Sequence, residues 1–429
     1  MKRYQILMAL ALPAFLLHAL WRGGWTALRQ RLGLGPKPDS TPRLWLHGAS
    51  LGEVTSARWV IDALLAERPG MHILVTTNSM SGRAMVAGWG LTGVDSALAP
   101  LDAGGAAGRL LDRVLPQALV IIENELWPAR IAAARWRGVP VLVIGARMSE
   151  RSARRWRLWP GLIGATLARI DWLSAQDDVS AMRFAALGLP LRARGPTLAL
   201  KSLAAPEVRP APFARPVERA SCLLAASTHE GEEKLVLAAF TAARAKGGPQ
   251  FLILAPRHPR RGDAIAKEIG QTGLAFVRWS KAEVPGAETA VLLADTLGEM
   301  PHWYAMSGTC IIGGTFAPKG GHTPFDPAHF GCAMIHGPSV TNFAAQFAAL
   351  DQGGGAIALS SAKDLTEALQ GLSAPGQARL AAAANACLAR FSDGASEVTT
   401  RLLQALPLSL RLGPQGAPGH PNQHPTRKL

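Results

Sequence analysis

The chain has 429 residues, and 48% of them are hydrophobic, which is enough for the cores of two or three domains. Only 17% are charged, which excludes a disordered polyelectrolyte and a histone-like nucleic-acid wrapper. The four cysteines are far apart and form no CxxC pair. A disulfide scaffold and a zinc ribbon are therefore disfavoured, and we expect a reducing compartment.

The formal net charge of +15 is concentrated in three places. Residues 1–35 carry +5 with no acidic residue, residues 129–157 carry eight arginines against Glu150, and the tail 404–429 adds +3. Local charge of this kind predicts an anionic partner that is met at particular places. Nucleic acid is disfavoured as that partner, because no nucleic-acid motif or stacking aromatic platform accompanies the charge.

Residues 1–35 are predicted to form a membrane anchor and its basic flank. The apolar run from Ile6 to Leu20 has fifteen residues, interrupted by Pro13 and His18. As a helix it reaches roughly 22 Å, which is short of a hydrocarbon core about 30 Å thick. Basic residues follow the run and no small-x-small cleavage site does, so we expect an uncleaved anchor at a cytoplasmic face. A cleaved signal peptide and a buried first helix stay open.

Short β-rich runs alternate with helical stretches from residue 43 onward. Near-continuous apolar runs are typical of parallel strands that are covered on both faces. Residues 36–195 are therefore expected to form an open parallel α/β domain. Its predicted strands are Leu44–His47, Ile73–Thr77, Ala118–Ile122, Val139–Ile144 and Trp172–Ser174.

The proline-rich stretch 196–219 predicts a linker, and residues 220–405 repeat the same alternation as a second α/β domain. The tail 406–429, rich in Pro, Gly and His, is expected to be disordered. Two such domains in tandem predict a ligand cleft at the carboxyl ends of their strands. The strands predicted in the second domain are Cys222–Ala226, Phe251–Ala255, Val291–Ala294, Cys310–Gly313 and Met334–His336.

Acidic residues stand at two strand ends of the first domain. Glu53 begins a helix after a small-residue loop, where it can be a general base or can merely complement the helix dipole, which would depress its pKa. Glu123 and Glu125 close the strand that ends at Ile122, either for catalysis or as loop and cap residues. Arginines then cluster from Arg147 onward, which suits phosphate binding or a solvated basic face.

Polar loops also follow the predicted strands of the second domain. Glycines before a helix start can expose backbone N–H groups to a phosphate, as the segment 313–327 would. No segment fits the P-loop pattern or GxGxxG, so ATPase and dinucleotide-binding functions are disfavoured. The histidines lack metal-ligand spacing, and no metal site is expected.

Seven of these segments, taken in chain order, resemble the Kdo (3-deoxy-D-manno-octulosonic acid) transferases of lipopolysaccharide synthesis, which are glycosyltransferases of the GT-B fold. The likeness spans about residues 30–400. The resemblance implies two Rossmann-like parallel-sheet domains that face a central cleft, behind an N-terminal membrane-anchor helix. The matching motifs are HGASLGE, IENELWP, ARMSERSAR, ASTHEGEE, APRHPRR, DTLGEM and GGTFAPKGGHTPFDPA.

The resemblance also implies a reaction and its residues. Kdo would pass from CMP-Kdo to a lipid A precursor, with inversion and without a metal or other cofactor, at the cytoplasmic face of the cell inner membrane. Glu53 would be the catalytic base and Glu123 would stabilise the transition state. The residues implied for CMP binding are Pro256, Arg257, Leu297, Gly298, Glu299, Thr323, Pro324, Phe325 and Asp326. Those expected to meet the acceptor's phosphates or the anionic membrane surface are Arg147, Arg151, Arg154 and Arg155.

Two departures from the family pattern leave alternatives open. Family members usually read HNPLE where this chain has HTPFD at 322–326, and a family lysine is missing from its expected place in 195–201, where Lys201 is the nearest candidate. One alternative is a GT-B transferase or an epimerase that uses another nucleotide sugar. The other is a non-catalytic paralogue that only binds a lipopolysaccharide precursor.

Overall fold

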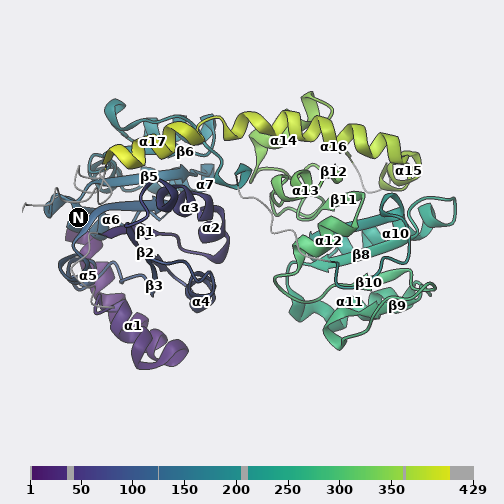
Figure 1. Ribbon diagram of the computed structural model, residues 1–429, viewed down its shortest axis with the longest axis horizontal. Coiled ribbons are helices and arrows are strands. Elements are labelled where there is room, and N and C mark those ends of the chain that lie inside the picture. The colour runs from purple at the N-terminus through teal and green to yellow at the C-terminus, as the bar shows by residue number, and fades with distance from the viewer. Residues whose placement is uncertain (1, 36–42, 124, 204–210, 361–363, 406–429) are drawn as a thin grey trace, which may run out of the picture. The chain divides into compact units, whose positions relative to one another are not determined.

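The computed structural model describes residues 2–35, 43–123, 125–203, 211–360 and 364–405 (Figure 1). The chain divides into two compact units, Met1–Leu200 with Gly394–Leu429, and Lys201–Asp393. The predicted disordered tail 406–429 lies outside the described residues, and so does the part of the predicted linker at 204–210.

The first unit is built on a six-stranded parallel sheet in the order β3-β2-β1-β4-β5-β6. The five strands predicted from apolar runs are confirmed, and β3 at one edge is an addition. The central strand β1 ends at His47, which is in register with Thr76 and Ile121 on the neighbouring strands. The strands are β1 Arg43–His47, β2 His72–Thr77, β3 Val94–Leu98, β4 Pro116–Ile122, β5 Val141–Ala146 and β6 Trp172–Ala175.

Helices surround this sheet, and their apolar stripes form its core. On α3, Val60, Ile61 and Leu64 are buried at the spacing of one helix face. The last helix of the described chain, α17, packs on α3, so the chain returns to the first unit after the second (Figure 1). The helices are α2 Leu51–Ser56, α3 Arg58–Glu67, α4 Met80–Gly88, α5 Ala106–Val114, α6 Pro128–Trp136, α7 Glu150–Arg157, α8 Pro160–Leu167, α9 Asp178–Ala186 and α17 Ala395–Ala405.

The N-terminal helix α1, Lys2–Arg31, is longer than the predicted apolar run and bends at Gly24, whose φ is 63°. The stretch Arg3–Arg31 is long and apolar enough to cross a membrane, by length and composition alone. Only 6% of its apolar window is buried, and Leu10 and Trp21 are more than three-quarters exposed. The alternative of a buried first helix is therefore wrong.

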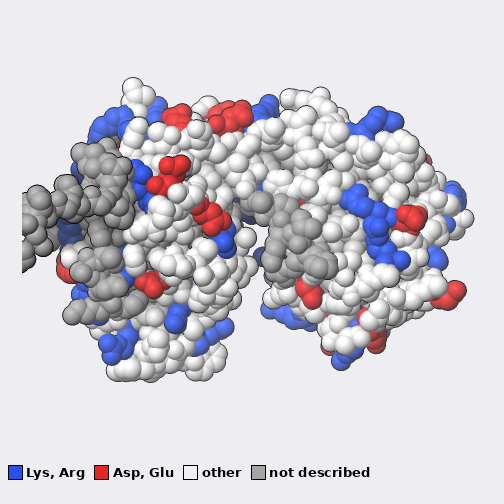
Figure 2. Space-filling view, in the orientation of Figure 1, with Lys and Arg blue, Asp and Glu red and all other residues white. Residues whose placement is uncertain are grey.

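Polar contacts attach α1 to the body of the first unit. Near its start, the Tyr4 hydroxyl donates to Asp102 at 2.6 Å, and near its end the Gln30 side chain accepts from the Leu98 amide at 2.8 Å. The molecular surface around α1 is mostly uncharged, with scattered basic groups (Figure 2). The helix thus lies against the edge of the sheet at β3 while most of its apolar surface stays exposed.

The second unit contains a seven-stranded parallel sheet in the order β13-β12-β11-β7-β8-β10-β9. The five predicted strands are again confirmed, and β9 and β13 at the two edges are additions. The strands are β7 Cys222–Thr228, β8 Phe251–Pro256, β9 Phe276–Arg278, β10 Val291–Leu293, β11 Thr309–Ile312, β12 Ala333–His336 and β13 Ala356–Ala358. The helices are α10 Glu232–Arg244, α11 Gly262–Gln271, α12 Met300–Met306, α13 Phe325–His329, α14 Ala344–Gln352, α15 Asp364–Gly371 and α16 Ala374–Ala389.

Candidate active site

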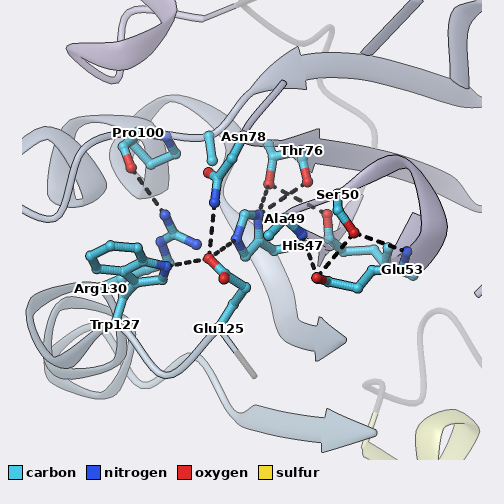
Figure 3. A network of polar contacts seen from close by, with 12 residues as sticks. His47, Ala49, Ser50, Glu53, Thr76, Asn78, Pro100, Glu125, Trp127 and Arg130 are labelled. Carbon is cyan, nitrogen blue, oxygen red and sulfur yellow. Dashed lines mark hydrogen bonds and ion pairs between the residues drawn. The ribbon is translucent and has the colours of Figure 1, made fainter. Parts of the chain in front are cut away.

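Glu53 lies in the first turn of α2, directly after the central strand β1. Ser50 caps this helix, because its hydroxyl accepts from the Glu53 amide at 3.3 Å and bonds the Glu53 carboxylate at 3.1 Å. The Ala49 amide donates to the other carboxylate oxygen at 2.7 Å (Figure 3). This arrangement resembles a capping box, except that the carboxylate accepts from the amide before the N-cap, and it holds the carboxylate in one position.

The surroundings of Glu53 act against its ionisation. Burial raises its pKa to about 7, and the negative charges of Glu123 and Glu125 add to the rise. Together they outweigh the hydrogen bonds from Ala49 and Ser50, which lower the pKa. The depressed pKa expected for a residue that only complements the helix dipole is not found. A carboxyl group that titrates near neutral pH can exchange a proton with a substrate.

Glu123 follows β4 with φ at 56°, a left-handed conformation that non-glycine residues rarely adopt. Its amide donates to the Ile144 carbonyl at 3.0 Å, so the ladder to β5 fixes the backbone at this point. Such strain costs roughly 1–3 kcal/mol and is concentrated at functional sites. The Glu123 charge raises the pKa of Glu53, so the two predicted catalytic carboxylates interact electrostatically.

Glu125, the next acid along, is held as a fixed negative charge. Two donors converge on its Oε2, Trp127 Nε1 and, at 3.0 Å, Asn78 Nδ2, and His47 Nε2 lies 3.4 Å from the same oxygen (Figure 3). Burial alone would raise the pKa of Glu125. The hydrogen bonds from His47 and Trp127, with the charge of Arg130, outweigh burial and bring that pKa to about 2.

Both ring nitrogens of His47 have an acceptor within reach. Burial lowers the pKa of His47 to about 4, so the ring is neutral near pH 7. Nδ1 lies 3.0 Å from both the carbonyl and the hydroxyl oxygen of Thr76, and Nε2 lies 3.4 Å from Glu125 Oε2. The neutral ring carries one proton, which binds the Thr76 carbonyl from Nδ1 or Glu125 from Nε2. The sequence predicts Glu125 only as one of two acids at this strand end, for catalysis or as a loop or cap residue, and carries no signal of its partners.

In the second unit, Pro256 ends β8 and Arg257 follows it with an exposed side chain. The Arg257 amide donates to the Thr228 carbonyl at 3.0 Å, which joins this loop to the end of β7. No described residue forms an ion pair with the Arg257 guanidinium. A cation that is exposed at a strand end and free of carboxylates suits an anionic ligand.

Three histidines gather beside Arg257. His229 Nε2 and His322 Nε2 lie 3.0 Å apart with ring planes 2° from parallel, and His258 stands edge-on to His229. Burial lowers the pKa of both paired rings, that of His322 to about 4, so one neutral ring donates to the other. Among the described residues, no group of His, Cys, Asp and Glu side chains could hold a metal ion.

Glu232, which the sequence analysis missed, organises the glycine-rich loop after β11. Its side chain is 3% exposed and accepts four backbone N–H groups. One oxygen binds the amides of His229 and Gly314, both at 2.8 Å, and the other binds those of Phe316 at 2.9 Å and Ala317 at 3.1 Å. A buried carboxylate with this many donors ties the loop to the end of β7.

Comparisons with known proteins place the chain in a family. A family model described as 3-deoxy-D-manno-octulosonic-acid transferase (Kdo transferase) matches residues 26–202. The 3-deoxy-D-manno-octulosonic acid transferase of Bordetella pertussis is 36% identical over 72% of this chain and 74% of its own length. The chain belongs to the Kdo transferase family. The enzyme of the same name from Haemophilus influenzae is 30% identical over 76% of this chain and 77% of its own.

Solved structures agree on the fold. UDP-GlcNAc 2-epimerase from Neisseria meningitidis, bound to UDP-GlcNAc, superposes with a TM-score of 0.58 over 85% of this chain and 100% of its own, at 13% identity. Identity this low shows a common fold alone. With two parallel sheets in the described chain, the expected GT-B-like α/β fold is confirmed.

Two further segments carry CMP-binding residues implied by the Kdo transferase motifs. In DTLGEM, Leu297 is 73% exposed, Gly298 has φ at 88°, and Glu299 accepts from the Thr296 hydroxyl. In HTPFD, the Phe325 amide donates to Thr323 Oγ1 at 3.3 Å, while the Phe325 ring is buried. Pro324 is the N-cap of α13.

The acid of HTPFD has a cationic neighbour. Burial raises the pKa of Asp326, and the charges of Lys201 and His329 oppose that rise. Lys201 also acts on His322, and its Nζ lies 5.5 Å from the centroid of the Phe343 ring. The only lysine near the expected family position is therefore brought to the HTPFD segment, although its spacing in the sequence differs.

The arginine-rich segment lies on the first unit. Arg151, Arg154 and Arg155 are exposed on α7, and Arg147 is half-buried in the loop after β5. Arg154 pairs with Glu150 at 3.1 Å, whereas no described carboxylate pairs with Arg151 or Arg155. Arg155 lines a cavity of about 500 Å³ together with residues of α1 and α8.

Proposed function

We propose that this chain is an inverting glycosyltransferase that moves Kdo from CMP-Kdo to a hydroxyl group of a phosphorylated lipid A precursor. It would act without a metal ion, at the cytoplasmic face of the cell inner membrane. Membership of the Kdo transferase family supports the donor and the reaction class. The observation that carries the proposal is Glu53, a half-buried carboxyl group with a pKa near 7 beside two further carboxylates.

The proposed step balances one proton and one electron pair. Ionised Glu53 accepts the proton of the acceptor hydroxyl while the hydroxyl oxygen forms a bond to the anomeric carbon of Kdo. The bond from that carbon to the phosphate oxygen breaks, and its electron pair leaves on CMP. Attack from the face opposite the leaving group inverts the anomeric centre, as in inverting glycosidases.

The charges around Glu53 suit this transition state. Transfer of a glycosyl group passes through an oxocarbenium-like state, in which positive charge develops on the sugar. Glu125 is a fixed negative charge, and the charges of Glu123 and Glu125 both act on Glu53. A preorganised charge of opposite sign stabilises the transition state without reorganisation at the moment of reaction. Glu123 would therefore be the transition-state stabiliser.

The second unit would hold CMP through loops at its strand ends. Arg257 would neutralise the leaving phosphate, and the backbone around Gly298 and Thr323 to Asp326 would contact the nucleotide. Lys201 would assist from beside Asp326, in place of the family lysine. All these contacts are proposals that rest on the family motifs and on the exposure of Arg257 and Leu297.

The first unit would meet the lipid and the membrane. The exposed apolar surface of α1 supports an N-terminal anchor. On α7, Arg151 and Arg155 have no carboxylate partner among the described residues, which favours contact with lipid phosphates over a neutralised helix face.

The test is incubation of the purified full chain with CMP-Kdo and a tetra-acylated lipid A precursor in EDTA, with product mass as the readout. We expect the acceptor to gain the mass of Kdo. Replacing Glu53 by Gln keeps the capping geometry and removes the base, so the rate should fall by about 10²–10⁴ while CMP binding is unchanged. Glu67→Gln makes the same substitution at an exposed site on the next helix and should leave the rate unchanged.

A near-normal rate for Glu53→Gln would rule out the assigned base. Binding of UDP in preference to CMP would favour a transferase or an epimerase with another nucleotide sugar. Retained binding of CMP and lipid without any turnover would favour a non-catalytic paralogue.

A further inference from the structure

A cavity of about 590 Å³ lies between α1 and the polar loops at the carboxyl edge of the first sheet. Its α1 wall is mainly apolar and includes Phe15 and Ala19. The opposite wall is mixed, with polar groups at Asn78, Ser79 and Ser81 and apolar side chains at Leu98 and Leu101. The cavity therefore joins an exposed apolar helix to a set of hydrogen-bonding groups.

Arg130 lines this cavity with unused hydrogen-bonding capacity. Its side chain is 2% exposed, and Nη2 donates to the Pro100 carbonyl at 3.0 Å. Nε and Nη1 are buried without a hydrogen-bond partner, and among the described residues no carboxylate forms an ion pair with the group. A buried guanidinium that has no carboxylate in direct contact favours an anionic ligand in the cavity that it lines.

Arg22 and Arg31 of α1 line the same cavity and bring its basic groups to three. The guanidinium of Arg31 donates to neutral acceptors, the carbonyls of Ala99 at 3.0 Å and Asn78 at 2.5 Å, so its charge stays uncompensated. The one carboxylate in the lining is Asp102. The cavity is therefore positively charged on balance, at the edge of an apolar helix.

The hydrogen bonds of Asp102 are already used elsewhere. Its oxygens accept from the Tyr4 hydroxyl at 2.6 Å and from the backbone amides of Ala129 at 2.9 Å and Arg130 at 2.6 Å. These contacts fix α1 and the start of α6 to the body of the unit. They leave the Arg130 guanidinium without a direct bond to this carboxylate.

We propose that this cavity binds the phosphate-monoester headgroup of the membrane lipid that serves as acceptor, with acyl chains along α1. A doubly charged, acceptor-only group matches three guanidinium groups, the Ser79 and Ser81 hydroxyls and the N-terminus of the nine-residue helix α4. The apolar α1 wall favours a lipid over a soluble phosphate. Taking that lipid to be the acceptor rests on the proposed function.

The cavity shares residues with the carboxylate cluster. Asn78 and Trp127 line the cavity, and both donate to Glu125 Oε2 (Figure 3). A phosphate bound here is thus separated from Glu125 by single side chains. The headgroup sugar that carries the phosphate then lies on the side of the carboxylates, where its hydroxyl can react.

The first test compares two exposed arginines of α1, one that lines the cavity and one that does not. Arg22 lines the cavity, whereas Arg29 lies elsewhere on the helix and lines a different pocket. The full chain is mixed with vesicles that contain phosphatidic acid, a phosphate monoester, or phosphatidylglycerol, a diester. We expect Arg22→Ala to weaken binding to phosphatidic acid about tenfold, as for one charge-assisted contact, and Arg29→Ala to keep the preference for phosphatidic acid.

Competition by inorganic phosphate at constant ionic strength distinguishes a lipid ligand from a soluble phosphate. We expect it to compete weakly, because it lacks acyl chains to contact α1. Displacement by micromolar phosphate would overturn the lipid assignment. If Arg22→Ala and Arg29→Ala lose equal affinity for both lipids, the cavity is not the phosphate-binding site. Such losses would reflect only the attraction of a basic helix to a charged membrane.

The second test uses transfer kinetics. Arg22→Ala and Arg130→Met should raise the acceptor KM about tenfold and leave the CMP-Kdo KM unchanged. If Arg130→Met does not fold, the acceptor KM of Arg22→Ala alone tests the proposal, because a substitution at the exposed Arg22 should not disturb folding. An unchanged acceptor KM in Arg22→Ala would overturn the inference while transfer by the wild type stands. If the wild-type chain transfers no Kdo, the proposed function is wrong. The vesicle comparison would still show whether the cavity binds a phosphate monoester.

Discussion

At the scale of single residues, Glu53 combines two effects that usually exclude each other. As the third residue of α2, Glu53 accepts hydrogen bonds from the Ala49 amide and the Ser50 hydroxyl, and such bonds favour the ionised form. Burial and two neighbouring carboxylates favour the protonated form more strongly. The cap therefore fixes where the carboxylate lies, and the neighbouring charges set the pH at which it can take a proton.

This arrangement predicts the pH dependence of the rate. Glu53 must be ionised to act as a base, so kcat/KM should rise with pH through a limb near pH 7. Glu123→Gln removes a like charge, which favours the ionised form of Glu53 and lowers its pKa. The limb should therefore move to lower pH in Glu123→Gln, and the maximal rate should fall if Glu123 stabilises the transition state as proposed.

The measurement is kcat/KM for the acceptor from pH 5 to 9 at constant ionic strength. Glu67→Gln serves as the control for removal of one negative charge at an exposed site of the same unit. A limb that stays at the same pH in Glu123→Gln would contradict the assigned interaction between the two carboxylates.

The sequence predicted part of this site and missed the rest for a physical reason. Glu53 and Glu123 each stand at a strand end inside a recognisable motif, so local pattern singled them out as candidates, and the family resemblance supplied their proposed roles. The role of Glu125 depends on His47 from β1, Asn78 after β2 and Trp127 before α6, which meet only in the folded sheet. The four backbone contacts of Glu232 are likewise invisible in the sequence, because their donors are up to 85 positions away.

At the scale of elements, the three strands that the sequence analysis missed all lie at sheet edges. They are β3, β9 and β13. The interior strands are covered on both faces and therefore read as continuous apolar runs. β3 has three unburied positions before its two buried ones, and β9 and β13 have three residues each, so the apolar runs that mark these strands are short. The return of α17 to the first unit also lacks a local signal.

The loop held by Glu232 gives the prediction at this scale. Glu232→Gln replaces one carboxylate oxygen with an NH₂ group that faces two backbone N–H donors, so about two of the four bonds are lost. We expect a loss of about 2–4 kcal/mol in the local stability of the loop. Hydrogen exchange at Gly314, Phe316 and Ala317 should accelerate at least tenfold, and CMP affinity should fall.

The control for this loop is Glu230→Gln, an exposed acid two residues away in the same motif. It should leave both hydrogen exchange and CMP affinity near wild-type values. Unchanged exchange in Glu232→Gln would show that the glycine-rich loop holds its conformation without the carboxylate. Faster exchange with unchanged CMP affinity would mean that the loop does not contact the nucleotide.

At the scale of the whole molecule, the net charge belongs mainly to the first unit. The basic blocks at 1–35 and 129–157 are both there, and the cavity lined by Tyr4, Leu7 and Arg155 shows that α1 and the arginine-rich helix α7 are neighbours. Exposed Leu158 and Trp159 follow that helix directly. Apolar side chains beside unpaired arginines are typical of a surface that lies on an anionic membrane. The basic residues of the tail lie outside the described residues.

This distribution predicts which arginines matter for membrane binding. A basic side chain near an anionic bilayer contributes about 1 kcal/mol, so the double variant Arg151→Ala, Arg155→Ala should bind anionic vesicles roughly 30-fold more weakly at low salt. The difference should shrink at 0.5 M salt, where the Debye length is only about 4 Å, and vanish on uncharged vesicles. Sedimentation with vesicles measures both effects.

The matched control removes the same formal charge from the same unit. Arg135 and Arg137 pair with Asp171 at 3.1 Å and Asp112 at 2.6 Å, so each is already neutralised locally. If geometry rather than net charge directs the molecule to the membrane, Arg135→Ala, Arg137→Ala should lose much less affinity than the α7 variant. Equal losses of affinity would mean that the net charge of +15 acts as a whole, and that α7 does not contact the membrane in preference to other basic surfaces.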